Sequence, residues 1–179
     1  MIELFLADTD HLISVLLLAT AFDLLIGEPP TALHPVVWIG NLIAFFKRSA
    51  PATHRKLYGV LFALVVILFA ASIAGAVLFI ANLPFLPGFV VLLIEAYFLK
   101  STFAIRRLIE AGMEVNTELV KGDLPSARQK LSMYVSRDTS QLSEGQVSSS
   151  VIETCSENFV DGILSPFFYY AILGPYGLI

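Results

Sequence analysis

The feature that most constrains this chain is a long run without charge. Between Lys56 and Glu95 lie 38 residues, 57–94, with no Asp, Glu, Lys or Arg. A helix rises about 1.5 Å per residue, so about 20 apolar residues cross the hydrocarbon core of a bilayer. The sequence therefore predicts a membrane-spanning helix over Leu57–Ala81.

Other apolar segments predict further membrane helices. Residues 82–88 carry two prolines and a glycine and predict a turn, after which 88–99 returns as a short span or a re-entrant segment. Residues 12–26 predict an imperfect first helix that could begin near residue 2. Residues 35–46 are too few to span, so we expect them at the membrane interface or buried. Residues 162–179 would begin a further membrane segment.

Composition agrees with an all-α integral membrane protein of about four hydrophobic helices. Of 179 residues, 56% are hydrophobic and 15% charged, against about 45–50% and 25% in an ordinary soluble domain. The mean hydropathy is +0.78. The net charge of −4 argues against a nucleic-acid partner, and the single Cys155 excludes a disulfide framework.

Residues 100–161 differ from the rest, because they hold 16 of the 26 charged residues. We expect a single membrane domain, 1–179, in which 1–99 are membrane helices with a basic loop and 100–161 form a helical cytoplasmic segment. Three helices are predicted there: an amphipathic one over 101–121 ended by Gly122, one from Asp123 and Pro125 through 128–135, and one from the capping box Ser143-x-x-Gln146 to about Phe159.

Basic residues predict the orientation. They gather in the loop before the long span and again directly after the second apolar segment. By the positive-inside rule both places lie on the cytoplasmic side of a multi-pass protein in the cell membrane. The residues are Lys47, Arg48, Arg55, Lys56, Lys100, Arg106 and Arg107.

Two carboxylate rows have the i, i+4, i+8 spacing of one helix face. Glu110, Glu114 and Glu118 have basic residues three or four positions away, which predicts a salt-bridged solvated face. Glu153, Glu157 and Asp161, with Asn158 beside them, follow the last basic residue of the chain, so no local cation is expected to neutralise them. Hard oxygen ligands near a membrane boundary suit Mg²⁺ carrying a phosphate, but plain surface charge explains the row equally.

Two further motifs carry polar groups. Asp23 lies inside an apolar stretch, where a carboxylate is costly and therefore a functional candidate, or else reaches the interface. Glu28 and His34 follow in a rigid, proline-containing turn. Arg137 could grip a phosphate through its planar fork, whereas Asp138 could equally cap a helix.

These motifs together resemble the cobalamin biosynthesis family called CbiB or CobD. The resemblance rests on three blocks in the family's order, and it covers roughly residues 12–177. The blocks are Asp23-Leu-Leu-Ile-Gly-Glu-Pro-Pro with His34-Pro-Val-Val-Trp-Ile-Gly; Val135-Ser-Arg-Asp-Thr-Ser-Gln-Leu; and Ile152-Glu-Thr-x-x-Glu-Asn-x-x-Asp-Gly with Ser165-Pro-Phe-Phe-Tyr.

The resemblance implies an adenosylcobinamide-phosphate synthase. Such an enzyme joins adenosylcobyric acid to (R)-1-amino-2-propanol or its O-phosphate through an amide, with ATP as co-substrate and Mg²⁺. It implies metal ligands among Glu153, Glu157 and Asp161, and phosphate or substrate binding by Arg137 and Asn158. Asp23, Glu28, His34 and Asp138 would be the catalytic residues, the first three deprotonating or binding the amine. The bilayer, and other membrane-bound corrinoid enzymes, are the implied partners.

Family members are longer than this chain, and a further Asn-Thr-Leu-Asp-Ser-like block follows in them, so we expect the chain to be an N-terminal part. The alternative is a non-catalytic membrane sensor resembling the AmpE branch of the same superfamily, which would not need the second acidic row. A transporter is disfavoured, because Leu57–Ala81 contains only Tyr58 and Ser72 beyond apolar and glycine positions.

Overall fold

The computed structural model describes residues 2–174, with side chains from residue 9 onward. Within that range the chain is all-helical and has no β-strand, which confirms the predicted class. Contacts divide it into two units, each described by itself: an apolar unit of residues 1–102 and 166–179, and a polar unit of residues 103–165.

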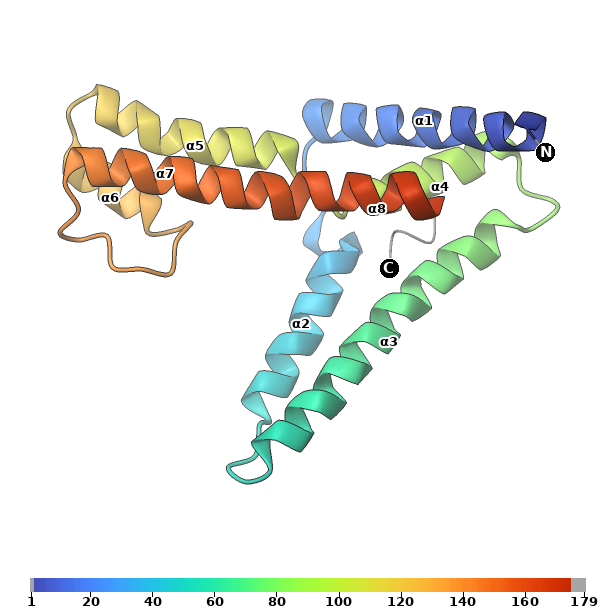
Figure 1. The fold of residues 1–179 in the computed structure, drawn as a ribbon, viewed down its shortest axis with the longest axis horizontal. Helices are drawn as coiled ribbons and strands as arrows, with labels where there is room; N and C mark the ends of the chain where they lie inside the picture. The colour runs from blue at the N-terminus through green and yellow to red at the C-terminus, as the bar shows by residue number, and fades with distance from the viewer. Residues whose placement is uncertain (1, 175–179) are drawn as a thin grey trace. The chain divides into compact units, whose positions relative to one another are not determined.

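The apolar unit contains helices α1 (Ile2–Leu25), η1 (Thr31–Leu33), α2 (Pro35–Arg48), α3 (Arg55–Ala81), α4 (Gly88–Lys100) and α8 (Ser165–Leu173), with Ser165 itself assigned to the polar unit. Helices α1 and α4 pack side by side (Figure 1). Their contact is lined by small and aliphatic side chains that are fully buried, which lets the two helices approach closely. These are Val15, Ala19, Ala96 and Leu99.

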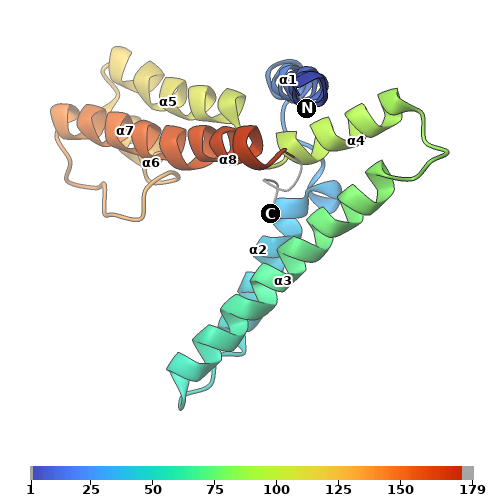
Figure 2. The same cartoon turned by 45° about the vertical axis from the view of Figure 1, so that its right-hand side comes forward.

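Helices α2 and α3 form a hairpin, visible from both directions in Figures 1 and 2. The ring of Phe46 lies 5.2 Å from that of Phe62, and the Tyr58 hydroxyl donates a 2.7 Å hydrogen bond to the Phe46 carbonyl. Only Pro35 of α2 is buried. Residues 35–46 are predicted to lie either at the membrane interface or buried. The buried alternative is therefore wrong, and the interfacial position stays a prediction.

Two helical stretches of the described residues are long and apolar enough to cross a membrane. They are Arg55–Ala81 and Gly88–Val120, the latter being α4 taken together with the helix that follows it. The long predicted span is thus confirmed as a helix, whereas the expected count of about four membrane helices is not. Helix α4 alone has 13 residues, or about 20 Å, less than the roughly 30 Å of a hydrocarbon core.

The polar unit packs α5 (Ile105–Val120), α6 (Leu124–Leu131) and α7 (Glu144–Phe159) around one small core. That core consists of Val115, Ala127, Leu131 and Val147. All three predicted helices are present. Helix α6 ends four residues before the predicted boundary, because the amides of residues 133–135 turn back to carbonyls of its last turn.

Local signals set the ends of these helices. Gly122 has a φ of +78°, which ends α5 as predicted. The Asp123 side chain accepts the Ser126 amide and begins α6, and the hydrogen bonds from this serine lower the pKa of Asp123. Ser143 and Gln146 form both bonds of the predicted capping box.

A π-helical turn, η2 (Val160–Leu164), follows α7 and was not predicted. The Ser165 amide reaches back to the Val160 carbonyl, five residues earlier, and the Ser165 hydroxyl donates to the same oxygen at 2.9 Å. The next residue is Pro166, whose ring has no N–H and crowds the carbonyl four residues back. A widened turn relieves that clash, and it carries Asp161.

Candidate functional site

The most deeply buried basic group of the described residues is Lys100, the last residue of α4. Its side chain is 2% exposed, and its Nζ lies 2.9 Å from Oδ1 of Asp23 and 2.9 Å from Oε1 of Glu28. Asp23, near the end of α1, is fully buried. The carboxylate that sequence reasoning placed in an apolar stretch therefore contacts a cation.

The turn after α1 brings Glu28 and His34 to the same place. Gly27 ends α1 with a φ of +87°, a backbone conformation that favours glycine. The His34 Nε2 then lies 3.0 Å from Oε2 of Glu28, opposite the oxygen that Lys100 contacts. Three predicted residues, Asp23, Glu28 and His34, thus meet at Lys100, and we call these four the Lys100 cluster.

Aromatic side chains fix this turn. The Trp38 indole donates a 2.8 Å hydrogen bond to the Ala32 carbonyl, and the Tyr97 hydroxyl donates to the Leu33 carbonyl at 2.5 Å. Because Tyr97 belongs to α4, the turn is anchored to the helix that supplies Lys100. The backbone directly before His34 is thereby tied to α2 and to α4.

Sequence reasoning missed Lys100 as a site residue and treated it only as an orientation marker. A signal was present, because a carboxylate inside an apolar helix needs a cationic partner. Lys100 ends another apolar helix. The same reasoning applies to Glu95 of α4, whose Oε2 lies 2.7 Å from Nε2 of His11 on α1.

The helix α2 separates the cluster from the basic loop. His34 precedes α2, whereas Lys47 and Arg48 end it. Fourteen helical residues measure about 20 Å. The prediction that Lys100 and the basic loop share the cytoplasmic side therefore stays a prediction.

In the polar unit, Arg137 contacts Glu153 of the second acidic row. Its Nη2 donates to Oε2 of Glu153 at 2.7 Å, with both side chains about half exposed. The sequence led us to expect no local cation, and the last turn of α7 has none; folding instead brings the more distant Arg137 against Glu153. Asn158 donates to the Thr154 carbonyl within its own helix.

The carboxylates of Glu153, Glu157 and Asp161 follow one another along α7 and η2. Among the residues that the structure describes, no group of three or more His, Cys, Asp or Glu side chains is arranged to hold a metal ion. These three residues thus do not form a closed site on their own. Mg²⁺ commonly binds through one or two carboxylates together with substrate phosphates, and that mode needs no such group.

Asp138 stabilises a turn. Its Oδ1 accepts the Ser140 amide at 2.9 Å, and this hydrogen bond lowers the pKa of Asp138. The adjacent Thr139 hydroxyl donates to the Arg128 carbonyl at 2.9 Å. The predicted alternative of a helix cap is wrong, because Ser143 is the N-cap of α7 and Asp138 lies in the turn before it.

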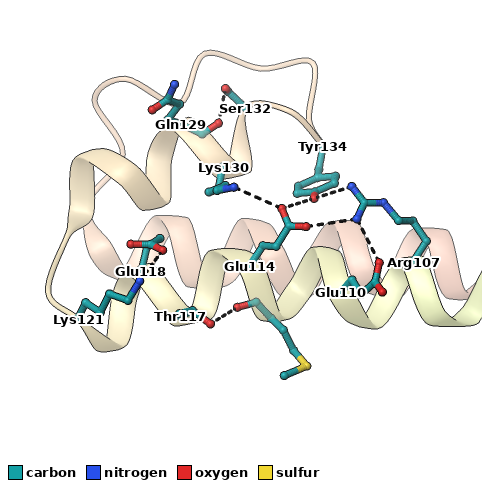
Figure 3. Close-up of polar contacts among 11 residues, drawn as sticks. Arg107, Glu110, Glu114, Thr117, Glu118, Lys121, Gln129, Lys130, Ser132 and Tyr134 are labelled. Atoms are coloured by element: carbon teal, nitrogen blue, oxygen red, sulfur yellow. Dashed lines mark hydrogen bonds and ion pairs between the residues drawn. The ribbon is translucent and has the colours of Figure 1, made fainter.

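The first acidic row forms the salt-bridged face that the sequence predicts (Figure 3). Arg107 contacts Glu110 and Glu114 at 3.2 Å each, and Lys121 contacts Glu118 at 2.9 Å. Tyr134, outside α5, donates a 2.8 Å hydrogen bond to Glu114. Burial raises the pKa of the Tyr134 phenol, and this bond raises it further.

A cavity of about 330 Å³ lies between α5 and α7. Its lining is mainly aliphatic, with Arg107, Tyr134, Thr154 and Asn158 as polar residues. Gly112 opens it, because a Cβ there would lie 3.4 Å from Sγ of Cys155. Cys155 is thus a packing residue at the edge of this cavity.

Comparison with known proteins places these residues in a sequence family. The family described as CobD/Cbib protein matches residues 16–179. The chain is 41% identical to a probable cobalamin biosynthesis protein CobD of Methanothermobacter thermautotrophicus, over 90% of this chain and 52% of that protein. It is 40% identical to its namesake in Methanothrix thermoacetophila, over 92% of this chain and 54% of that protein.

A cyanobacterial relative extends the match beyond the archaea. The cobalamin biosynthesis protein CobD of Synechocystis is 35% identical over 91% of this chain and 49% of its own length. The chain therefore spans about half the length of the curated relatives it matches. No solved structure matches it.

Proposed function

Because the chain belongs to the CobD/Cbib family, we propose that it acts in cobalamin biosynthesis as an adenosylcobinamide-phosphate synthase. The reaction would form an amide between the propionate carboxylate of adenosylcobyric acid and the amine of 1-amino-2-propanol or its O-phosphate. The observation that carries the proposal is the Lys100 cluster. It gathers three residues of the family's first block, Asp23, Glu28 and His34, around the buried ammonium of Lys100.

The chemistry makes three demands on the protein. A carboxylate resists attack by an amine until one oxygen becomes a leaving group, which ATP can provide by phosphorylation. The amine must lose a proton before it attacks, and carboxylates and imidazole can accept it. The cluster supplies such groups.

Phosphate binding falls to Arg137 in this proposal. Its side chain is 49% exposed and its contact with Glu153 uses one terminal nitrogen, so the rest of the fork could meet a phosphate. Mg²⁺ bound with ATP would neutralise phosphate charge. Glu153, Glu157 or Asp161 could hold it through one or two carboxylates, and Asn158 beside them could contact substrate.

The proposal is tested by incubating the chain in membranes with adenosylcobyric acid, ATP, Mg²⁺ and each amine. We expect an amide product by mass spectrometry, lost in Glu157→Ala. The matched control is Glu144→Ala, which removes an acidic side chain from the first turn of the same helix and should leave product formation unchanged. If no amide product formed with 1-amino-2-propanol or with its O-phosphate, the proposal would be contradicted.

The phosphate role of Arg137 is tested separately. Arg137→Lys keeps the charge but loses the planar fork, so the KM for aminopropanol phosphate should rise about tenfold, the effect of one weakened charge-assisted hydrogen bond. The KM for free aminopropanol should stay constant. Arg106→Lys, an equally exposed arginine of α5, is the control, and equal losses for both amines would contradict the role.

We also propose that the protein crosses the cell membrane, with the basic loop before α3 in the cytoplasm. The support is the apolar length of Arg55–Ala81 and its basic N-terminal end. In the membrane the protein would work beside other corrinoid enzymes. A reporter inserted at residues 50–53 should give a cytoplasmic signal, and an external signal would reverse the orientation.

A further inference from the structure

We infer that the Lys100 cluster is a binding site for a primary ammonium group, and that Nδ1 of His34 accepts first its hydrogen bond and then its proton. The inference rests on the proposed function for the identity of the amine, 1-amino-2-propanol. It deepens that function by naming the one atom that binds and deprotonates the amine, a role for which Asp23, Glu28 and His34 were equal candidates.

The members of the cluster differ in exposure: Asp23 and Lys100 are buried, whereas Glu28 is exposed. The exposed fraction of the side chain is 0% for Asp23 and 2% for Lys100, rises to 13% for His34, and reaches 38% for Glu28. In this inference, a small ligand would approach His34 from the side of Glu28, the most exposed member of the cluster. The ion pair of Asp23 and Lys100 lies beneath.

The contacts of Glu28 determine the tautomer of a neutral His34. One carboxylate oxygen faces the Lys100 ammonium and the other faces His34 Nε2. A carboxylate only accepts hydrogen bonds, so Nε2 carries the hydrogen, and in the neutral ring Nδ1 then carries a lone pair.

Nδ1 of His34 is buried and meets no hydrogen-bond donor among the residues that the structure describes. A buried acceptor without a donor destabilises the fold, because it has lost its water. Trp38 and Tyr97 nevertheless fix the backbone before His34, and Glu28 contacts the ring at Nε2. A ligand N–H at this atom would satisfy the acceptor.

Charge selects the class of ligand. With neutral His34, the carboxylates of Asp23 and Glu28 face the single ammonium of Lys100, which leaves one net negative charge. A phosphate or a substrate carboxylate would be repelled. A primary ammonium supplies both the positive charge and the N–H donors that Nδ1 requires.

The proton transfer that follows is balanced. An N–H bond of the ammonium breaks, its proton forms a bond to His34 Nδ1, and the electron pair stays on nitrogen as the nucleophile. Glu28 stabilises the resulting imidazolium through Nε2–H. His34 is therefore the catalytic residue, whereas Lys100 is a positioning residue that holds Glu28 against it.

Two substitutions of His34 separate its two nitrogens. In His34→Gln the side-chain amide nitrogen can take the place of Nε2 and still donate to Glu28, but no atom replaces Nδ1. In His34→Asn the amide group takes the place of Nδ1 and can present an acceptor there.

Titration calorimetry with 1-amino-2-propanol, on the full chain in nanodiscs, measures the difference between the variants. Binding should be weakened at least tenfold in His34→Gln, the effect of one lost hydrogen bond to a charged group. Binding to His34→Asn should stay within about threefold of wild type, because the acceptor is kept.

A series of related ligands provides a second test of the same inference. Propane-1,2-diol lacks the ammonium and should not bind. The N,N,N-trimethyl derivative keeps the charge but has no N–H, so it should bind wild type at least tenfold more weakly than the parent amine, since its hydrogen bond is lost. In His34→Gln the two amines should bind alike.

Equal affinity of wild type and His34→Gln for the amine, or no binding to wild type, would overturn the inference. Loss of binding in His34→Asn as large as in His34→Gln would also overturn it, provided both variants keep the helical circular dichroism of wild type. The assay contains no corrinoid or ATP, so it is separate from the proposed function. Binding at His34 without amide formation would refute only that function, and amide formation by His34→Gln with an unchanged KM for the amine would refute only this inference.

Discussion

The two units use the same kinds of charged side chain in opposite settings. In the apolar unit, Asp23 and Lys100 pair with 0% and 2% of their side chains exposed. In the polar unit, Glu114 is 31% exposed, and its partners Arg107 and Lys130 are 52% and 42% exposed. Geometry alone does not separate them, because the pairs are all within 4 Å.

The difference in burial changes what each pair does. An exposed ion pair gains little, since water solvates each charge nearly as well as the partner does. A buried pair loses that solvation, so its members depend on each other, and removing one leaves an unpaired charge inside. A buried cluster is costly to keep, and this is why the Lys100 cluster, rather than the network in Figure 3, is the candidate for function.

The largest expected effect comes from removing the shared cation. Lys100→Met leaves the buried carboxylate of Asp23 without its cation, and should lower the free energy of unfolding by about 3–5 kcal/mol. Lys130→Met removes one exposed partner of Glu114, and should leave the melting temperature unchanged. Thermal melting of both variants in the same detergent measures the difference. Similar melting temperatures for the two variants would remove the distinction between the units.

Neutralising one carboxylate should have a smaller effect. Asp23→Asn preserves the shape, and Lys100 still contacts Glu28, so we expect a loss of about 1–3 kcal/mol. Glu114→Gln, the matched change in the polar unit, should shift the melting temperature only slightly, because the amide oxygen can still accept from Tyr134. A loss in Asp23→Asn as large as in Lys100→Met would show that Glu28 does not stabilise Lys100.

Sequence reasoning succeeded where the signal was local. The span over residues 57–81, the stop at Gly122, the start at Asp123 and the capping box at Ser143 each depend on a few adjacent residues. Such patterns determine backbone conformation within a turn or two. They therefore predicted where most helices begin and end.

Contacts between distant residues were beyond these patterns. Lys100 meets Glu28 across 72 positions, and Arg137 meets Glu153 across 16. Sequence reasoning identified Asp23, Glu28 and His34 one by one, and only packing of α1 against α4 brings them to Lys100. The π-turn was missed for another reason: its cause, Pro166, was interpreted only as part of a family block.

The polar unit should respond to alkaline pH through Tyr134. Its pKa is raised in the folded state, first by burial and then by the bond to Glu114. Its contribution to stability is therefore complete below the ordinary value of 10.0 and is lost as pH rises through the higher folded value. Tyr134→Phe should remove that alkaline loss, which melting curves at pH 8 and pH 11 would show. An identical alkaline loss in the variant would assign the effect to another group.

The smallest effect should come from Asp123, an exposed carboxylate that needs no buried cation. The hydroxyl and amide of Ser126 donate to it and lower its folded pKa. Its contribution is thus complete above the ordinary value of 3.8 and is lost as pH falls through the lower folded value. Asp123→Asn keeps a capping oxygen that does not titrate, so its melting temperature should fall less than that of wild type between pH 6 and pH 3. Glu118→Gln, on the exposed face of α5, is the control. Equal falls in wild type and Asp123→Asn would mean that acid destabilises the chain elsewhere, and the buried carboxylates of the Lys100 cluster would then be the next groups to test.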